Sequence, residues 1–315
     1  MILPIRDDVL AARDRISGLV ERTSLIESEV RGTRIWLKCE CLQIGGAFKL
    51  RGATNRLLQL SPKERERGVV AFSSGNHARG VAIAARRLGI RAIIVMPADA
   101  PKVKIDGTRG EGAEIVFYDR ATESREAIAG RIASEIGATV VPSFDDPMIV
   151  AGQGTVGIEI VEQLGRSPSR IVVPCGGGGL ASGIALACPD AQMVIVEPEG
   201  WDDMGQSLAA GEIVPVAPDA PRTLCDAIIT PRVSPITLNI LTQSSARALW
   251  VNDAEVADAI RFAWKKHQLV VEPGAAVGLA ALLAGKVEAD TDTVVLLSGG
   301  NVDPALHAQI VSEAA

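Results

Sequence analysis

The segment "RIVVPCGGGGLASGIALA", residues 170–187, runs from a short apolar strand through four consecutive glycines into a small-residue helix. Its first part is apolar on both faces, as in a strand buried inside a parallel sheet. Glycines permit positive φ and leave backbone N–H groups unshielded by a Cβ. Such groups, with the N-terminus of the next helix, form an anion site suited to phosphate. A tight turn without a ligand is the alternative, but four glycines are costly in chain entropy for a turn alone.

The same alternation of short strands and helices continues along most of the chain, which predicts an α/β fold with open, mostly parallel twisted sheets. Helices are expected at 77–89, 123–137, 253–267 and 274–285, and glycines after Leu88 and Ile136 predict helix ends. Strands are expected at 34–40, 69–72, 92–96, 114–118, 139–143, 170–174, 193–197, 246–251 and 293–299.

This many strands predicts two domains rather than one. The series from Val69 to Val141 has the character of a smaller unit inserted in a larger one. We therefore expect a small mobile domain at residues 58–142, and a large domain built from residues 1–57 and 143–315.

Composition excludes several classes of protein. The formal net charge is −6, and there is no Lys/Arg stripe of the kind that nucleic-acid binding needs. No run approaches the roughly 20 apolar residues of a membrane span, and the N-terminal stretch is not a signal peptide. An odd number of cysteines without a C-x-x-C pair predicts reduced thiols, a cytoplasmic location and buried packing rather than metal binding. They are Cys39, Cys41, Cys175, Cys188 and Cys225.

The segment "GGAFKLRGATN", residues 45–55, places Lys49 among glycines and alanines. A surface lysine needs no such setting, but a lysine that meets a flat, phosphorylated partner does. Lys49 therefore suits a Schiff base with pyridoxal 5′-phosphate, an aldehyde with one phosphate, because small neighbours such as Gly46 and Ala47 leave room for its ring.

Two further segments end buried strands in polar residues, at the sheet edge where ligands of open α/β sheets bind. "VVAFSSGNHARG", residues 69–80, contains Ser73, Ser74, Asn76 and His77, and "VVLLSGGNVD", residues 294–303, contains Ser298. Helix N-capping is the alternative for the first three, and a hydrogen-bonded histidine at a helix start is the simpler reading of His77.

Five motifs in order, "GAFKLRGA", "SSGNHA", "AGQGT", "CGGGGL" and "SGGNVD", resemble the fold-type-II pyridoxal-phosphate enzymes of the threonine/serine dehydratase and serine racemase group. The resemblance extends from about Ile5 to Val302. It implies a tryptophan-synthase-β-like fold with the cofactor in the cleft between two domains, and a homodimer.

The resemblance also implies a role for each matching residue at the cofactor. Lys49 would be the Schiff-base lysine and Phe48 would flank the ring. Asn76 would bond the ring hydroxyl, and Ser298 would face the pyridine nitrogen. The phosphate would be held by Gly176, Gly177, Gly178, Gly179 and Leu180.

Substrate contacts follow from the same comparison. Ser73, Ser74 and His77 would receive the substrate carboxylate, and Ser74 would also act as acid or base on the face opposite Lys49. Arg125 would approach the carboxyl group when the domains close; a solvated helix arginine is the alternative.

The segment "EPEGWDDM" resembles a divalent-cation site of this group. Glu197, the carbonyl of Trp201 and Asp203 would be the protein ligands. An all-oxygen shell suits Mg²⁺, Ca²⁺ or Mn²⁺. A loop with surface acids is the alternative.

The resemblance implies an ammonia-lyase that removes water and ammonia from a hydroxy amino acid, L-threonine or L-serine first, giving a 2-oxo acid. A 3-hydroxyaspartate dehydratase is a variant that needs one more cationic contact, for which Arg79 is a candidate. A serine or aspartate racemase is the second hypothesis. A β-replacement enzyme and a non-catalytic sensor on this fold fit the motifs less well. We expect no regulatory extension after the last motif.

Overall fold

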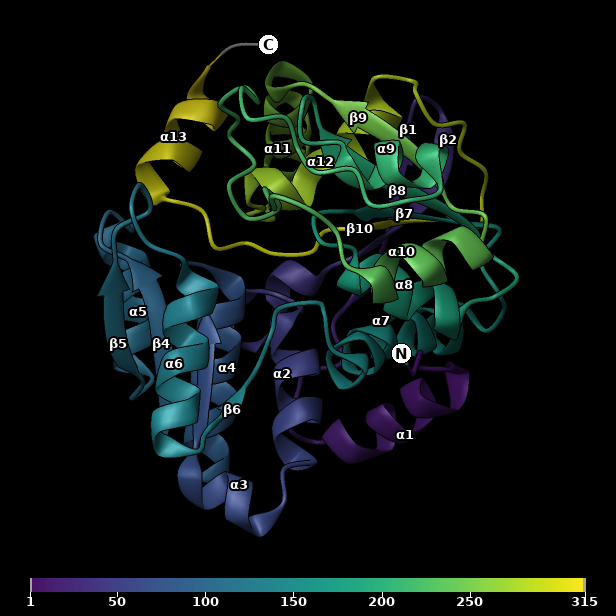
Figure 1. The fold of residues 1–315 in the computed structure, drawn as a ribbon. Coiled ribbons are helices and arrows are strands. Elements are labelled where there is room, and N and C mark those ends of the chain that lie inside the picture. The colour runs from purple at the N-terminus through teal and green to yellow at the C-terminus, as the bar shows by residue number, and fades with distance from the viewer. Residues whose placement is uncertain (1, 314–315) are drawn as a thin grey trace.

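The computed structural model describes residues 2–313 and contains two separate sheets, each with its own helices (Figure 1). The larger sheet has the strand order β1-β2-β10-β7-β8-β9. Its neighbouring strands are parallel except for β1 and β2. Its strands are β1 (Leu25–Val30), β2 (Thr33–Lys38), β7 (Arg170–Pro174), β8 (Gln192–Pro198), β9 (Arg247–Val251) and β10 (Thr293–Leu296).

The smaller sheet is parallel throughout and has the order β5-β4-β3-β6. Its strands are consecutive in the chain and lie between residues 69 and 140, inside the range expected for the small domain. The domain boundaries themselves and the mobility of this part stay predictions. The strands are β3 (Val69–Phe72), β4 (Ala92–Pro97), β5 (Glu114–Tyr118) and β6 (Thr139–Val140).

Helices cover both faces of the larger sheet, because its strands alternate between two aliphatic clusters. In β7, Ile171 and Val173 join the cluster under α1, α7, α8 and α10, whereas Val172 joins the cluster under α11 and α12. These helices are α1 (Arg6–Ile16), α7 (Pro147–Leu164), α8 (Gly179–Ala187), α10 (Pro235–Gln243), α11 (Asp253–His267) and α12 (Pro273–Leu283); α9 (Asp203–Ala210) and α13 (Pro304–Ser312) complete this part.

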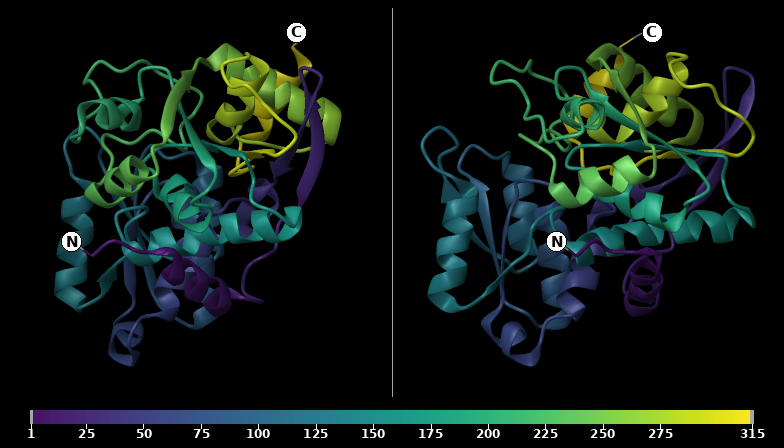
Figure 2. Two further views of the ribbon diagram at one scale, coloured as in Figure 1. Left: turned by 90° about the vertical axis from the view of Figure 1, so that its right-hand side faces the viewer. Right: turned by 45° about the vertical axis from the view of Figure 1, so that its right-hand side comes forward.

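Helix α2 (Lys49–Leu58) lies between the two parts, as the views in Figures 1 and 2 agree. Its residues Leu50, Ala53 and Leu57 belong to the same core cluster as β3 and β4 of the smaller sheet. The remaining helices are α3 (Pro62–Arg67), α4 (Asn76–Leu88), α5 (Lys102–Gly110) and α6 (Arg125–Ile136), with short 3₁₀ turns η1 (Glu40–Leu42) and η2 (Ile44–Gly46).

The α/β class, the nine expected strands and the four expected helices are confirmed, although some strand ends shift by up to three residues. Gly89 and Gly137 end α4 and α6 with φ of 66° and 70°, as expected for left-handed C-caps. The five cysteines are buried and free. Among residues 2–313, no helix combines the length and apolarity needed to cross a membrane.

Candidate active site

A cavity of about 530 Å³ is lined by loops that follow the carboxyl ends of strands in both sheets. Ligands bind at this edge in open α/β sheets. Except for Arg79, the structure brings together the residues for which the sequence predicted cofactor or substrate contact, although their roles stay predictions. The cavity wall includes Phe48, Lys49, Ser73, Ser74, Asn76, His77, Arg125, Gly176, Gly177, Gly178, Gly179, Leu180 and Ser298.

Lys49 begins helix α2, and its amine lies partly buried in the cavity wall. Nζ donates to the carbonyl of Ser143 at 3.1 Å and lies 5.1 Å from the centre of the Phe48 ring. Burial lowers the pKa of Lys49 to about 8, and the nearby Glu272 carboxylate only partly opposes this shift. A free amine near neutral pH is what an attack on an aldehyde requires.

The pKa of Lys49 predicts how cofactor capture depends on pH. Only the unprotonated amine attacks an aldehyde, so the rate should rise with pH and level off above about 8. An ordinary lysine would be less than about 1% free at that pH. The measurement is the initial rate of the visible absorbance change after pyridoxal phosphate is added to cofactor-free protein. A midpoint near 10 would contradict this description of the site.

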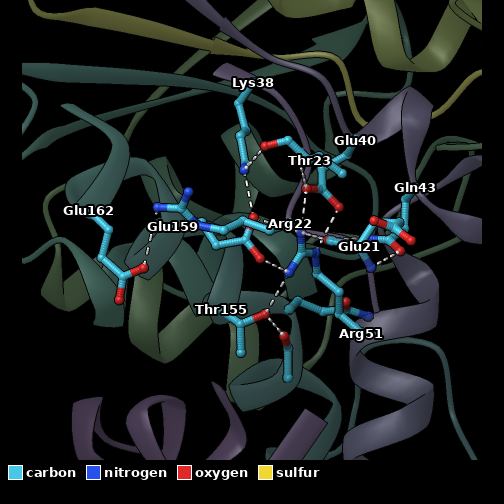
Figure 3. Close-up of polar contacts among 12 residues, drawn as sticks. Glu21, Arg22, Thr23, Lys38, Glu40, Gln43, Arg51, Thr155, Glu159 and Glu162 are labelled. Carbon is cyan, nitrogen blue, oxygen red and sulfur yellow. Dashed lines mark hydrogen bonds and ion pairs between the residues drawn. The ribbon is translucent and has the colours of Figure 1, made fainter. Parts of the chain in front are cut away.

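A buried ion network anchors helix α2 two residues beyond Lys49 (Figure 3). The guanidinium of Arg51, 0% exposed, bonds both oxygens of Glu40 at 2.8 Å and both oxygens of Glu159 at 2.6 and 2.9 Å. Lys38 is also fully buried and donates to Glu159 at 2.6 Å. Two cations therefore balance two carboxylates, and the network joins α2 to β2 and α7.

The glycine loop has the features of an anion cradle. Within the described residues, none of the N–H groups of Gly176–Gly179 donates a hydrogen bond, and α8 begins at Gly179. Gly178 has φ of +84°. A Cβ on Gly177 would lie 2.3 Å from the ring of Phe144, so close packing demands glycine there as well. Unpaired N–H groups at a helix N-terminus fit a phosphate.

The loop after β3 presents its polar residues to the cavity rather than capping α4. Gly75 is the N-cap residue of α4, without a side-chain cap bond, and the Ser73 hydroxyl accepts from the Gly75 N–H at 3.2 Å. His77 is 3% exposed, and its Nε2 lies 2.9 Å from the carbonyl of Val141. Burial and the nearby amine of Lys49 lower the pKa of His77 to about 3, so the imidazole is neutral.

Basic and acidic side chains both line the part of the cavity near the small sheet, where Lys104 pairs with Asp226 and Arg120 with Asp99. Arg125 begins α6, lies 5.7 Å from the centre of the Phe72 ring and pairs with Glu126 at 2.8 Å. Lys104 and Arg120 line the same cavity. Arg79, the candidate for contact with a second substrate carboxylate, lies outside it and donates instead to Asn301 at 3.0 Å.

Several ionisable residues of this cavity were not predicted from the sequence, and the one nearest to Lys49 in its electrostatic effect is Glu272. Glu272 is 3% exposed and lines the cavity beside Lys49 and Ser298. Burial raises the pKa of Glu272 to about 7. Its only sequence signal is an acid directly before Pro273 at a helix start, a pattern that usually indicates a surface cap.

The residues of the suggested cation site come together at the start of α9. Glu197 is fully buried and accepts from the N–H groups of Met204 and Gly205 at 3.0 and 2.9 Å. Asp203 is 1% exposed, and its Oδ2 has no hydrogen-bond partner. Among the described residues, no cluster of three or more His, Cys, Asp or Glu side chains is placed to hold a metal ion.

Comparison with known proteins agrees with this geometry. Residues 16–299 match the family model described as "Pyridoxal-phosphate dependent enzyme". The chain is 42% identical to an L-threo-3-hydroxyaspartate ammonia-lyase of Pseudomonas sp, over 96% of this chain and 97% of the relative. It is 39% identical to an L-threonine ammonia-lyase of Thermotoga maritima, over 98% of this chain and 78% of the relative. The solved structure of maize serine racemase superposes with a TM-score of 0.92 at 35% identity, covering 98% and 97% of the two chains.

These findings define a fold-type-II pyridoxal-phosphate enzyme. The chain belongs to the pyridoxal-phosphate dependent enzyme family, in the group that contains ammonia-lyases and serine racemases.

Proposed function

We propose that this chain is an ammonia-lyase that removes water and ammonia from a 3-hydroxy amino acid and releases a 2-oxo acid. The observation that carries the proposal is the amine of Lys49, with its pKa lowered to about 8, in one cavity with the glycine loop and Ser298. Bound there, pyridoxal phosphate supplies an aldehyde for an amine and a ring that withdraws electrons from the substrate α-carbon.

The residues of the chain would divide the remaining work. The N–H groups of Gly176–Gly179 hold the phosphate, and Phe48 flanks the ring. Ser298, a neutral hydroxyl, faces the pyridine nitrogen and does not force it to be protonated. The loop with Ser74 and His77 binds the substrate carboxylate. Lys49 removes the α-proton as a general base, and the β-hydroxyl takes up a proton and leaves as water. The released enamine is then hydrolysed by one water molecule to the 2-oxo acid and ammonia.

For the substrate, we place 3-hydroxyaspartate ahead of L-threonine and L-serine, which the sequence alone favoured. Support comes from the relative of Pseudomonas sp, named an L-threo-3-hydroxyaspartate ammonia-lyase, and from the basic residues Lys104, Arg120 and Arg125 in the cavity wall. A second carboxylate needs such a charge, because an unpaired anion is costly to bury.

The test is 2-oxo acid release by the cofactor-loaded protein from each 3-hydroxyaspartate stereoisomer, L-threonine and L-serine, assayed separately with Mg²⁺ present. The proposal predicts the highest kcat/KM for one 3-hydroxyaspartate isomer. Faster turnover of threonine or serine would restore the first expectation. No release from any of them would remove the lyase assignment.

Racemisation is the second candidate, because Lys49 and Ser74 line the same cavity and the chain resembles maize serine racemase. If Ser74 exchanges a proton on the face opposite Lys49, Ser74→Ala should lower racemisation of serine or aspartate by about 10²-fold or more and reduce elimination less. Chiral chromatography of the amino acids, beside the 2-oxo acid assay, separates the two activities. An equal loss of both would contradict a racemase role for Ser74.

We also propose that Glu197, Asp203 and the Trp201 carbonyl bind Mg²⁺ or a similar cation. The buried, unpartnered Asp203 Oδ2 fits such a ligand, and burial raises the pKa of Asp203 to about 7. Mg²⁺ at 100 times its Kd should stabilise the fold by about 2.7 kcal/mol. This gain should grow as pH rises through 7, because the cation needs the ionised carboxylate.

Thermal unfolding with and without Mg²⁺ measures this effect. Asp203→Asn should lose the stabilisation, whereas the control Asp202→Asn should keep it. Equal stabilisation of both variants would place the ion elsewhere.

We further propose that the chain forms a homodimer. Light scattering tests this by comparing the mass of the protein in solution with the chain mass of 33.0 kDa.

A further inference from the structure

A chain of hydrogen bonds begins outside the cavity and ends in its wall, where the start of α4 meets the loops before α12 and after β10. Arg79 donates to Asn301 Oδ1 at 3.0 Å, and Asn301 Nδ2 donates to Asn76 Oδ1 at 2.8 Å. Asn76 Nδ2 then donates to Glu272 Oε1 at 2.5 Å. These hydrogen bonds thus link two residues of α4, Asn76 and Arg79, to Glu272 before α12 and Asn301 after β10.

The ends of this chain determine the orientation of both amides. Arginine can only donate, so it fixes Asn301 Oδ1 as an acceptor. The two hydrogens of Asn301 Nδ2 go to the carbonyl of Gly45, at 2.8 Å, and to Asn76 Oδ1. Above pH 7, where Glu272 is mostly ionised, its carboxylate can only accept, so it takes one hydrogen of Asn76 Nδ2. The second hydrogen of Asn76 Nδ2 remains without a partner among these residues. If the Asn76 amide were flipped, its NH₂ group would face the donor Asn301 Nδ2 and its oxygen would face the acceptor Glu272.

Two glycines of the neighbouring loops leave space for the side chains of Glu272 and Asn301. Glu272 is the N-cap residue of α12, yet its side chain makes no cap bond and turns to Asn76 instead. A Cβ on Gly299 would lie 1.9 Å from Glu272 Oε1, and a Cβ on Gly46 would lie 2.4 Å from Asn301 Oδ1. Both glycines of the surrounding loops are therefore required for the chain of hydrogen bonds.

We propose that Glu272 and Asn301 are positioning residues, which hold the Asn76 amide with its second N–H directed at the cofactor. This N–H then selects an acceptor oxygen, the ionised ring hydroxyl of the cofactor. This inference rests on the proposed function, which assigns Asn76 to that hydroxyl. Without the two partners, the amide of Asn76 turns freely and loses much of this selection. A hydrogen bond to a charged oxygen is worth about tenfold or more in affinity.

A thermodynamic cycle on cofactor-free protein tests this without using activity. The Kd is measured for pyridoxal phosphate and for 3-deoxypyridoxal phosphate, which lacks only the ring hydroxyl. We expect the wild type to discriminate between them by about tenfold or more. Glu272→Ala and Asn301→Ala should each lose most of this ratio, and Glu272→Gln, which retains an acceptor, should keep most of it. Asp226→Asn is the control, a carboxylate of the same cavity wall without a bond to Asn76.

The outcomes distinguish the role of Asn76 itself from the positioning role of Glu272 and Asn301. If Asn76→Ala keeps the full ratio, Asn76 does not contact the hydroxyl, and that part of the proposed function fails. If Asn76→Ala loses the ratio while Glu272→Ala and Asn301→Ala retain it, the positioning role is overturned. A purely structural role would weaken binding of both cofactors equally and leave the ratio unchanged, which also overturns the inference. Circular dichroism checks folding, and the two alanine variants act independently should one fail to fold.

Discussion

Lys49→Ala is expected to abolish the visible absorbance of the bound cofactor and to lower turnover by at least about 10³-fold. Lys49 is the amine placed in the cavity wall beside Phe48, with a pKa lowered to about 8. Lys49→Arg should behave in the same way, because a guanidinium keeps the charge but cannot join to an aldehyde. Absorbance spectra and 2-oxo acid release measure the two effects.

Lys104→Ala is the matched control, since Lys104 is a second lysine of the same cavity wall. It should retain the visible absorbance. If Lys49→Ala keeps both absorbance and turnover, the assignment of Lys49 is wrong. If absorbance disappears in the Lys104 variant instead, the cofactor is attached to the other lysine.

Arg51→Met is expected to destabilise the fold by about 3–5 kcal/mol, because it leaves two buried carboxylates with one cation. Arg51 bonds Glu40 and Glu159 in the network of Figure 3, and its side chain is 0% exposed. Glu159→Gln should also destabilise the fold, because the two buried cations Lys38 and Arg51 are then left with one carboxylate, Glu40. The free energy of unfolding from chemical denaturation is the measurement.

Arg131→Ala provides the contrast, because Arg131 pairs with Glu135 on the exposed side of α6, with side chains 63% and 57% exposed. Such a pair is worth about 0.3–0.5 kcal/mol. A loss below about 1 kcal/mol for Arg51→Met would show that the network does not hold α2, and the anchoring of Lys49 would need another explanation.

Local patterns sufficed for much of the fold and the site. The apolar run 170–174 is buried on both faces because helices cover both sides of its sheet, so periodicity alone indicated the strand. The glycine loop and the residues after β3 and β10 stand at carboxyl ends of parallel strands, and this topology brings them to one cavity.

Other features depend on distant partners and carry little local signal. Strand β1 has no long apolar run, and only Ser28 and Val30 of its residues are buried. The sequence therefore did not predict this strand or its pairing with β2. Glu272 meets Asn76 across 196 residues of sequence, and Arg51 meets Glu159 across 108. A charged residue in a sequence gives no indication that a partner far along the chain will neutralise it inside the core.

The most direct test of the central claim is to locate the lysine that carries the cofactor. The loaded protein is reduced with borohydride, digested with trypsin and analysed by mass spectrometry. The proposed site predicts a phosphopyridoxyl group on Lys49, within an uncleaved peptide covering residues 39–51, "CECLQIGGAFKLR". An adduct on another lysine, or stable cofactor binding without any adduct, would contradict the account of this protein as a Lys49-based pyridoxal-phosphate enzyme.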